Sequence, residues 1–172
     1  MADLSQKTTL LILEDEPELA EILKEALEPV ADQILVAHEG EQAWKMIESH
    51  SVDAILADYQ VPKLTGLQLV ERMLRAKRKI PIVIHTAHAS PELITKATLY
   101  GALSFVTKPA KLKELEHLMD KAVKMGFRIR HIEDELEKIC EENSIPLADR
   151  AQFKKDNKEQ RIVEIITDSL CK

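Results

Sequence analysis

Short apolar runs alternate five times with segments of helical periodicity between residues 9 and about 123, and this alternation limits the fold more than any other feature. A short apolar run bounded by polar and turn residues is typical of a buried strand. Repeated strand–helix units form a parallel sheet that helices cover on both faces, with right-handed crossovers. The sequence therefore predicts an α/β protein with a doubly wound, five-stranded parallel sheet.

The apolar periodicity also places the individual elements. Strands are expected at residues 10–13, 33–37, 53–58, 82–84 and 103–106, and helices at 17–26, 42–49, 66–76, 91–101 and from about 111 onward. Proline suits the first turn of a helix and a hydroxyl side chain caps its start, so Pro17 and the pair Ser90-Pro91 mark two helix starts. The fifth helix is expected to extend into a small helical tail.

Composition excludes several classes of protein. A net charge of −6 argues against a general nucleic-acid binder, which needs a basic face. Cys140 and Cys171 lack the paired spacing of a zinc or redox motif. No apolar run approaches the roughly 20 residues of a membrane span, and residues 1–9 lack the apolar core of a signal peptide. We expect a cytoplasmic protein that binds neither a membrane nor nucleic acid directly.

Polar side chains stand at the carboxyl ends of four predicted strands. Glu14 and Asp15 follow the first strand, and Asp58 ends the third. Thr86 follows the fourth strand and Lys108 follows the fifth. In a parallel sheet of order 2-1-3-4-5, ligands bind outside these ends, beside the switch point between strands one and three. We therefore expect three acids, a hydroxyl and an ammonium group in one crevice.

This set of groups suits phosphoryl chemistry. Three neighbouring carboxylates repel one another unless a cation intervenes. Mg²⁺ prefers oxygen ligands and retains water and phosphate oxygens in its octahedron. A carboxylate can itself act as a nucleophile and form an aspartyl phosphate, whose charge a metal ion and an ammonium group neutralise. The pattern predicts a phosphoryl acceptor that uses Mg²⁺.

Five motifs, in order along the chain, resemble the receiver domain of two-component response regulators over residues 7–123. The motifs are Leu11-Ile12-Leu13-Glu14-Asp15-Glu16, Asp58-x-x-Val61-Pro62-x-x-x-Gly66, Thr86-Ala87, Gly101-Ala102 and Lys108-Pro109. Each motif alone is weak, but all five at this spacing are highly specific. The resemblance implies a flavodoxin-like fold and a phosphoacceptor domain at 7–123, followed by a helical extension at 124–172.

The resemblance also implies roles for particular residues. Asp58 would accept the phosphoryl group, Thr86 and Lys108 would contact it, and Phe105 would be the aromatic switch residue. The peptide bond between Lys108 and Pro109 would be cis. The implied metal ligands are Glu14, Asp15, Asp58 and the backbone carbonyl of Gln60.

Glu14, Val61 and His85 depart from the usual pattern of the family, and Val61 replaces the commoner Met. Glu14 stands where Asp is commoner, which keeps the charge and lengthens the arm. His85 stands directly before the threonine motif, where an apolar residue is usual, and His88 follows that motif. We interpret both histidines as ordinary loop residues. In the alternative, His88 and Gln60 flank the phosphoryl pocket and tune the lifetime of the acyl phosphate.

By resemblance, the function is that of a response regulator receiver in a two-component phosphorelay, not an enzyme beyond its own phosphorylation and dephosphorylation. The implied partners are a sensor histidine kinase or phosphotransfer protein, and a downstream protein. An intermediate receiver that passes phosphoryl to a histidine phosphotransfer partner is an alternative. An aspartate-nucleophile phosphatase is disfavoured, because it needs a second Asp where this chain has Gln60. A flavin protein is disfavoured because the first strand ends in acids.

The tail allows two interpretations. Its apolar residues alternate by three and four, which predicts a coiled coil to about residue 143 and a homodimer through residues 112–143. In the alternative, this helix folds back as extra core. Gly126 weakens the helix by roughly 1 kcal/mol relative to Ala, which suits a hinge. The predicted seam is Leu115, Leu118, Ala122, Met125, Ile129, Ile132, Leu136, Ile139 and Asn143.

The end of the chain is less informative. Pro146 ends the long helix, and a short amphipathic helix is expected at about 159–170. The 10 basic and 11 acidic residues from Lys124 to Lys172 leave no electrostatic footprint for DNA. His131 is interpreted as a solvated surface residue rather than a phosphohistidine.

Overall fold

The computed structural model describes residues 7–152 and 154–157. The chain divides into two compact units, residues 1–126 and residues 127–172, and each is described by itself. Helix α5 (Leu112–Glu142) contributes its first half to one unit and its second half to the other. None of the helices in the described part of the chain is long and apolar enough to cross a membrane.

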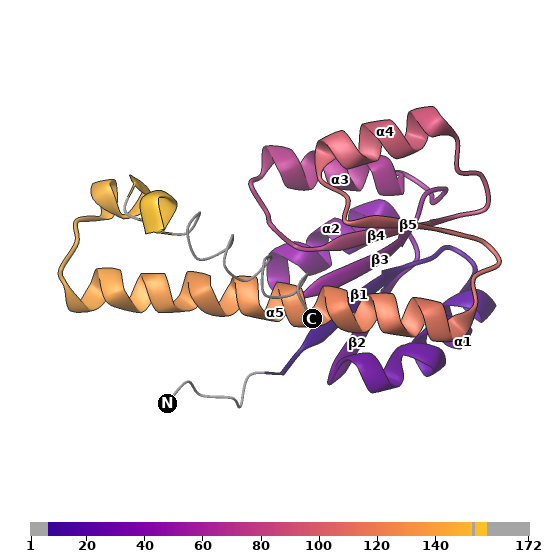
Figure 1. Cartoon of the computed structure of the whole chain (residues 1–172), viewed down its shortest axis with the longest axis horizontal. Coiled ribbons are helices and arrows are strands. Elements are labelled where there is room, and N and C mark those ends of the chain that lie inside the picture. Colours follow the sequence, from indigo (N-terminus) through magenta and orange to yellow (C-terminus); the bar gives the residue numbers. More distant parts are fainter. Residues whose placement is uncertain (1–6, 153, 158–172) are drawn as a thin grey trace. The chain divides into compact units, whose positions relative to one another are not determined.

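A five-stranded sheet forms the centre of the first unit (Figure 1). The strands follow the order β2-β1-β3-β4-β5, and every neighbouring pair is parallel. This confirms the predicted doubly wound, flavodoxin-like sheet. The strands are β1 (Thr9–Leu13), β2 (Gln33–Ala37), β3 (Ala54–Asp58), β4 (Ile82–Thr86) and β5 (Ser104–Thr107).

Local sequence signals start the helices where they were expected. The hydroxyl of Ser90 accepts a hydrogen bond from the backbone of Leu93, and Thr65 forms a reciprocal capping box with Gln68. Pro29 lies in a 3₁₀ turn (Glu28–Val30) that directly follows the first helix. The other helices are α1 (Pro17–Leu27), α2 (Gly40–Ser49), α3 (Gly66–Arg75) and α4 (Pro91–Tyr100).

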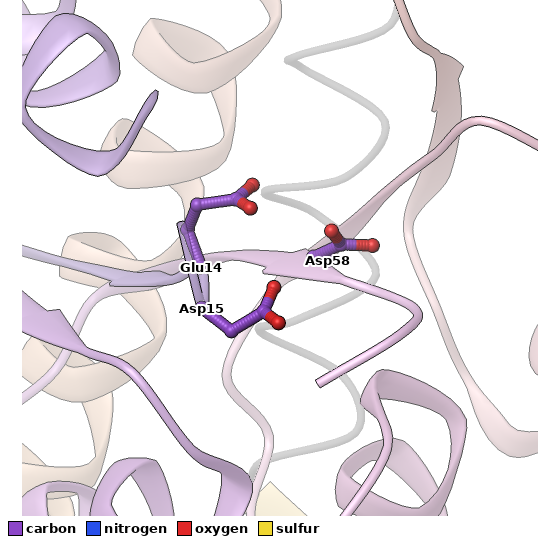
Figure 2. Close-up of side chains that lie close together, drawn as sticks. All are labelled: Glu14, Asp15 and Asp58. Atoms are coloured by element: carbon purple, nitrogen blue, oxygen red, sulfur yellow. The ribbon is translucent and has the colours of Figure 1, made fainter. Parts of the chain in front are cut away.

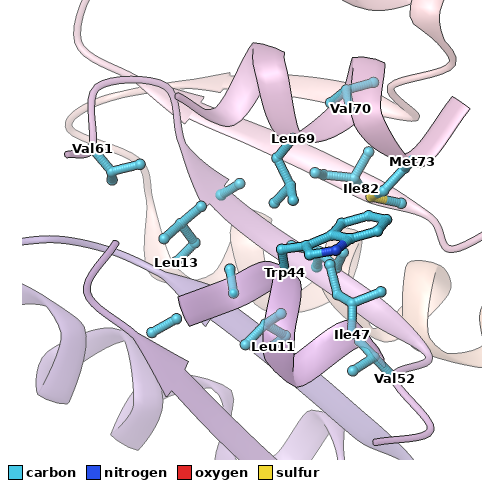
Figure 3. Packing of buried hydrophobic residues seen from close by; sticks show 14 of the residues in the cluster. Leu11, Leu13, Trp44, Ile47, Val52, Val61, Leu69, Val70, Met73 and Ile82 are labelled. Carbon is cyan, nitrogen blue, oxygen red and sulfur yellow. The ribbon is translucent and has the colours of Figure 1, made fainter. Parts of the chain in front are cut away.

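Two apolar layers enclose the sheet. Alternate strand residues point to opposite faces, so Leu11 and Ile55 pack with Trp44 and Leu69 of α2 and α3 (Figure 3). On the other face, residues such as Leu56 pack against α1 and the first half of α5. Full burial of one such Leu or Ile side chain contributes about 1.5–3 kcal/mol. These layers fix the strands and hence the positions of the side chains at their carboxyl ends.

Gly126 marks a close approach of α5 to the sheet. A Cβ atom at this position would lie 1.6 Å from the backbone oxygen of Asp53, just before β3. Helix α5 is continuous through Gly126. The glycine therefore permits close packing in the structure, rather than interrupting the helix as a hinge.

The second unit contains a helical turn-back. Helix α5 ends where Ser144 adopts a φ of 53° and the backbone N–H of Ile145 donates to Cys140 O at 2.9 Å. Residues 147–152 and 154–157 are again helical. The carboxylate of Glu137 pairs with Arg150 at 2.7 Å and also with Lys154. We call these three residues the Glu137 cluster.

Burial along the second half of α5 differs from the predicted seam. Ile132, Leu136 and Cys140 are buried at four-residue spacing. Asn143, expected at a core position, is exposed, and its side-chain amide donates to the backbone oxygen of Ile139 at 2.8 Å. The homodimer through residues 112–143 stays a prediction. The helix expected at about 159–170 lies outside the described residues.

Candidate functional site

Three acids meet at the carboxyl edge of the sheet. Glu14 and Asp15 directly follow β1, and Asp58 is the last residue of β3. Because β1 and β3 are neighbours, their carboxyl ends bring these side chains together (Figure 2). One oxygen from each of the three carboxylates lies within 4.8 Å of the others. We call Glu14, Asp15 and Asp58 the acid cluster.

Lys108 reaches the acid cluster from the end of β5, the edge strand of the sheet. It directly follows β5, and β4 lies between β5 and β3. Its ammonium group lies 2.6 Å from Asp58 Oδ2 and 2.8 Å from Glu14 Oε2. The structure therefore brings four of the predicted site residues into one constellation. Lys108 joins two of the acids directly.

The electrostatics of this constellation are unbalanced. Glu14 is 1% exposed, and its burial raises the pKa of the carboxyl; the nearby Lys108 opposes this rise and Asp58 adds to it. Burial alone would lower the pKa of Lys108, but its hydrogen bonds to Asp58 and Glu14 outweigh that, so the pKa is raised. The Glu14 Oε1 atom is buried without a hydrogen-bond partner.

These observations fit a divalent cation. Among the described residues, three carboxylates face a single ammonium group, and one buried carboxylate oxygen lacks a partner. An unpaired buried oxygen costs free energy that a metal ligand bond would offset. Mg²⁺ accepts such an all-oxygen donor set.

The family model of the response regulator receiver domain matches residues 10–120. This chain belongs to that family. Response regulator GtcR of Aneurinibacillus migulanus is 33% identical over 126 residues, which cover 73% of this chain and 52% of GtcR. Transcriptional regulatory protein GlrR of Escherichia coli is 28% identical over 117 residues, 68% of this chain and 26% of GlrR. The chain thus spans only part of the curated relatives it matches.

Solved structures carry the same fold. The signal receiver domain of a putative Luxo repressor protein from Vibrio parahaemolyticus matches with a TM-score of 0.68 at 23% identity, over 77% of this chain and 98% of that one. The signal receiver domain of a signal transduction histidine kinase from Syntrophus aciditrophicus matches with a TM-score of 0.61 at 28% identity, over 68% and 90%. This chain therefore contains a receiver domain, and its helix α5 continues past the residues that the family model matches.

The remaining predicted site residues of the receiver domain have different surroundings. The backbone N–H of Gln60 donates to Asp58 Oδ1 at 3.0 Å. Thr86 is buried, and its hydroxyl bonds to the backbone of His88, accepting from the N–H at 3.2 Å, rather than to an acid. Phe105 is half-buried and packs against the core layer that contains Trp44. The Lys108–Pro109 peptide bond is cis, as the resemblance implied.

One of the two histidine interpretations was wrong. His85 is not a loop residue: it belongs to β4, pairs with Asp58 in the strand register, and is 4% exposed. Burial and, to a smaller extent, the charge of Lys108 lower the pKa of His85 to about 4 against the opposing charge of Asp58, so the ring is neutral at pH 7. Neither ring nitrogen has a hydrogen-bond partner among the described residues. His88 follows β4 and is exposed.

His38 was missed by sequence reasoning. It follows β2, and its Nδ1 lies 2.9 Å from the backbone oxygen of Glu14. This contact supports the turn that carries the first two acids. The strand-end rule that identified the other residues applies equally to His38, because it directly follows Ala37, the last residue of β2.

Proposed function

We propose that Asp58 of this receiver domain accepts a phosphoryl group from the phosphohistidine of a sensor kinase or phosphotransfer protein. In the transfer, a carboxylate oxygen of Asp58 bonds to phosphorus. The bond from phosphorus to the imidazole nitrogen breaks, and its electron pair stays on that nitrogen. The observation that supports this best is the Lys108 ammonium group, held 2.6 Å from Asp58 at the edge where three acids converge.

Each neighbour of Asp58 has a role in this proposal. Glu14, Asp15, Asp58 and the backbone carbonyl of Gln60 would hold Mg²⁺, which when bound neutralises charge on the phosphoryl oxygens. Lys108 would supply a second positive charge to the same oxygens. The Gln60 N–H that donates to Asp58 Oδ1 fixes the orientation of the carboxylate. The proposed reaction needs no separate catalytic base, because a carboxylate attacks without losing a proton.

The proposed output is a change of packing on the face formed by α4, β5 and the first half of α5. Phosphoryl oxygens would draw the Thr86 hydroxyl away from its present partner, the backbone of His88. Phe105 is half-buried and would turn inward into the space that Thr86 leaves. Such a switch is a shift between two packings that the phosphoryl group stabilises unequally. A downstream protein would bind the altered face.

The test is labelling with acetyl phosphate and Mg²⁺, followed by intact-mass measurement. Wild-type protein should gain one phosphoryl group that alkali removes, as expected for an acyl phosphate. Asp58→Asn should gain none. Asp32→Asn is the matched control, because Asp32 precedes β2 at the opposite edge of the sheet, and it should label like the wild type. Undiminished labelling of Asp58→Asn, or a label stable to alkali, would contradict the assignment of the acceptor.

A relay receiver is the second candidate, and one relative favours it: the Syntrophus structure is a receiver domain of a histidine kinase. A relay receiver passes its phosphoryl group onward, so its phosphorylated form should lose the label rapidly when a histidine phosphotransfer protein is added. A response regulator should keep the label under the same conditions.

A further inference from the structure

A buried histidine lies in the path between Lys108 and the acids. Strand pairing aligns Asp58 of β3 with His85 of β4, and the next strand, β5, leads into Lys108. Neighbouring strands are about 4.8 Å apart. To reach Asp58, the side chain of Lys108 must therefore pass the carboxyl end of β4, where His85 and Thr86 lie.

The surroundings of His85 leave room for Lys108 to move. Both residues line a pocket of about 330 Å³, whose other walls are apolar side chains of α1, of the loop after Lys108 and of the first turn of α5. The two ring nitrogens of His85 are buried and have no partner among the described residues. A buried nitrogen without a partner costs free energy, so a donor that arrives there gains more than it would at the surface.

Lys108 and a divalent cation would both bind the carboxylates of Glu14 and Asp58. The ammonium group now uses Glu14 Oε2 and Asp58 Oδ2, and both carboxylates belong to the acid cluster. A cation held by these carboxylates would repel the ammonium group and weaken its hydrogen bonds to them. Lys108 then needs another acceptor, and its side chain is only 18% exposed, so water replaces the lost bonds poorly.

We propose that His85 is a positioning residue that receives Lys108 when a divalent cation occupies the acid cluster. A neutral imidazole has one nitrogen that accepts a hydrogen bond, and the lysine ammonium group donates to it. The lysine thereby stays inside the site, next to Asp58, rather than turning into solvent. The inference rests on the proposed cation site.

The first test is Mg²⁺ titration by calorimetry, without any phosphodonor. His85→Leu should bind Mg²⁺ about tenfold more weakly than the wild type, because a hydrogen bond from a charged donor is lost only in the metal-bound state. Without metal, the same variant should be at least as stable to urea as the wild type, since it removes two unpaired nitrogens. A merely structural role for His85 would lower stability and leave the affinity for Mg²⁺ unchanged.

Further variants isolate the contact with the lysine. In a Lys108→Met background, His85→Leu should leave Mg²⁺ affinity unchanged, so the two substitutions are coupled. Asn carries an amide oxygen near the Nδ1 position and Gln near the Nε2 position, and at least one of these variants should restore binding to within about threefold of wild type. In ¹⁵N NMR spectra, Mg²⁺ should shift one ring nitrogen of His85 in the wild type and neither in Lys108→Met.

The outcomes separate this inference from the proposed function. If the wild type fails to bind Mg²⁺, the cation site is wrong and the inference falls with it. If the wild type binds Mg²⁺ and His85→Leu binds equally well, the cation site stands and only the role of His85 is overturned. If His85→Leu lowers the affinity for Mg²⁺ equally in the wild-type and Lys108→Met backgrounds, the role of His85 is also overturned.

Discussion

The acid cluster with Lys108 and the Glu137 cluster both join carboxylates to cations, but in opposite proportions. At the carboxyl edge of the sheet, three acids share one ammonium group, and Glu14 is buried with an unpaired oxygen. In the second unit, Glu137 alone meets Arg150 and Lys154, and these side chains are 39%, 21% and 33% exposed. The first arrangement leaves negative charge uncompensated, whereas the second does not.

The difference separates the proposed binding site from a structural contact. Residues of the Glu137 cluster lie near one another in the sequence, and water reaches all three, so the ion pairs contribute little. The acid cluster gathers residues from separate strands into a place where unpaired charge is costly. Such an unfavourable arrangement is expected where a bound ligand offsets its free energy, which agrees with a cation site in a receiver domain. The following predictions test this contrast.

Removal of Lys108 should have the largest effect. Lys108→Met leaves Glu14 and Asp58 without their cation, and we expect the stability of the first unit to fall by about 3–5 kcal/mol at pH 7 without divalent ions. Millimolar Mg²⁺ should recover much of this loss. Urea unfolding followed by the fluorescence of Trp44, the single tryptophan and a residue of the first core layer, measures both. Lys111→Met, which removes an exposed pair with Glu114, is the control and should change stability by less than about 1 kcal/mol.

The pH dependence of stability should show the buried imidazole beside the acid cluster. His85 has a pKa of about 4 in the folded state and 6.5 as its ordinary value, so the unfolded state binds the proton first. The neutral burial of His85 contributes about 3 kcal/mol to the free energy of unfolding above pH 6.5, and this contribution is lost as the pH falls toward 4. The raised pKa of Glu14 has the opposite effect: as the pH falls through part of this range, it increases the stability of the folded state. The difference between wild-type and His85→Leu stability from pH 7 to 4 isolates the histidine. An unchanged difference would contradict its neutral burial.

The last residue of the first unit gives a third test. Ala favours a helix over Gly by about 1 kcal/mol, but a Cβ at Gly126 would meet the backbone oxygen of Asp53 at 1.6 Å. Gly126→Ala should therefore destabilise the first unit by about 1–3 kcal/mol, the usual cost of overpacking. Urea unfolding monitored at Trp44 measures the change. A gain in stability would show that Gly126 is only a weak point in the helix.

Loss of the Glu137 cluster should have the smallest effect. Glu137→Gln should lower the stability of the second unit by at most about 1 kcal/mol, because its ion pairs are partly exposed. Amides of the helical residues 147–152 should exchange with deuterium faster, while the unfolding transition at Trp44 and the affinity for Mg²⁺ stay unchanged. A large loss of stability, or weaker Mg²⁺ binding, would remove the distinction between the two clusters.

The agreement between sequence and structure depends on the range of the interactions involved. Strand–helix alternation and the caps at Ser90 and Thr65 are local patterns, so the elements of the first unit formed close to where they were expected. The position of His85 depended on whether β4 ends at residue 84 or 86, a difference too small for periodicity to resolve. That difference changed an expected loop residue into a buried neighbour of Asp58.

The sequence alone predicted the order of the strands, because apolar periodicity selects the fold. It also predicted the polar residues at the strand ends, because parallel strands end at one edge of the sheet. Tertiary structure alone decided which atoms there have partners: that Lys108 joins Asp58 to Glu14, that the nitrogens of His85 lack partners, and that Gly126 meets Asp53. The physical reason is that hydrogen bonds and steric contacts depend on differences of about 1 Å between residues far apart in the chain, and no local pattern encodes such distances.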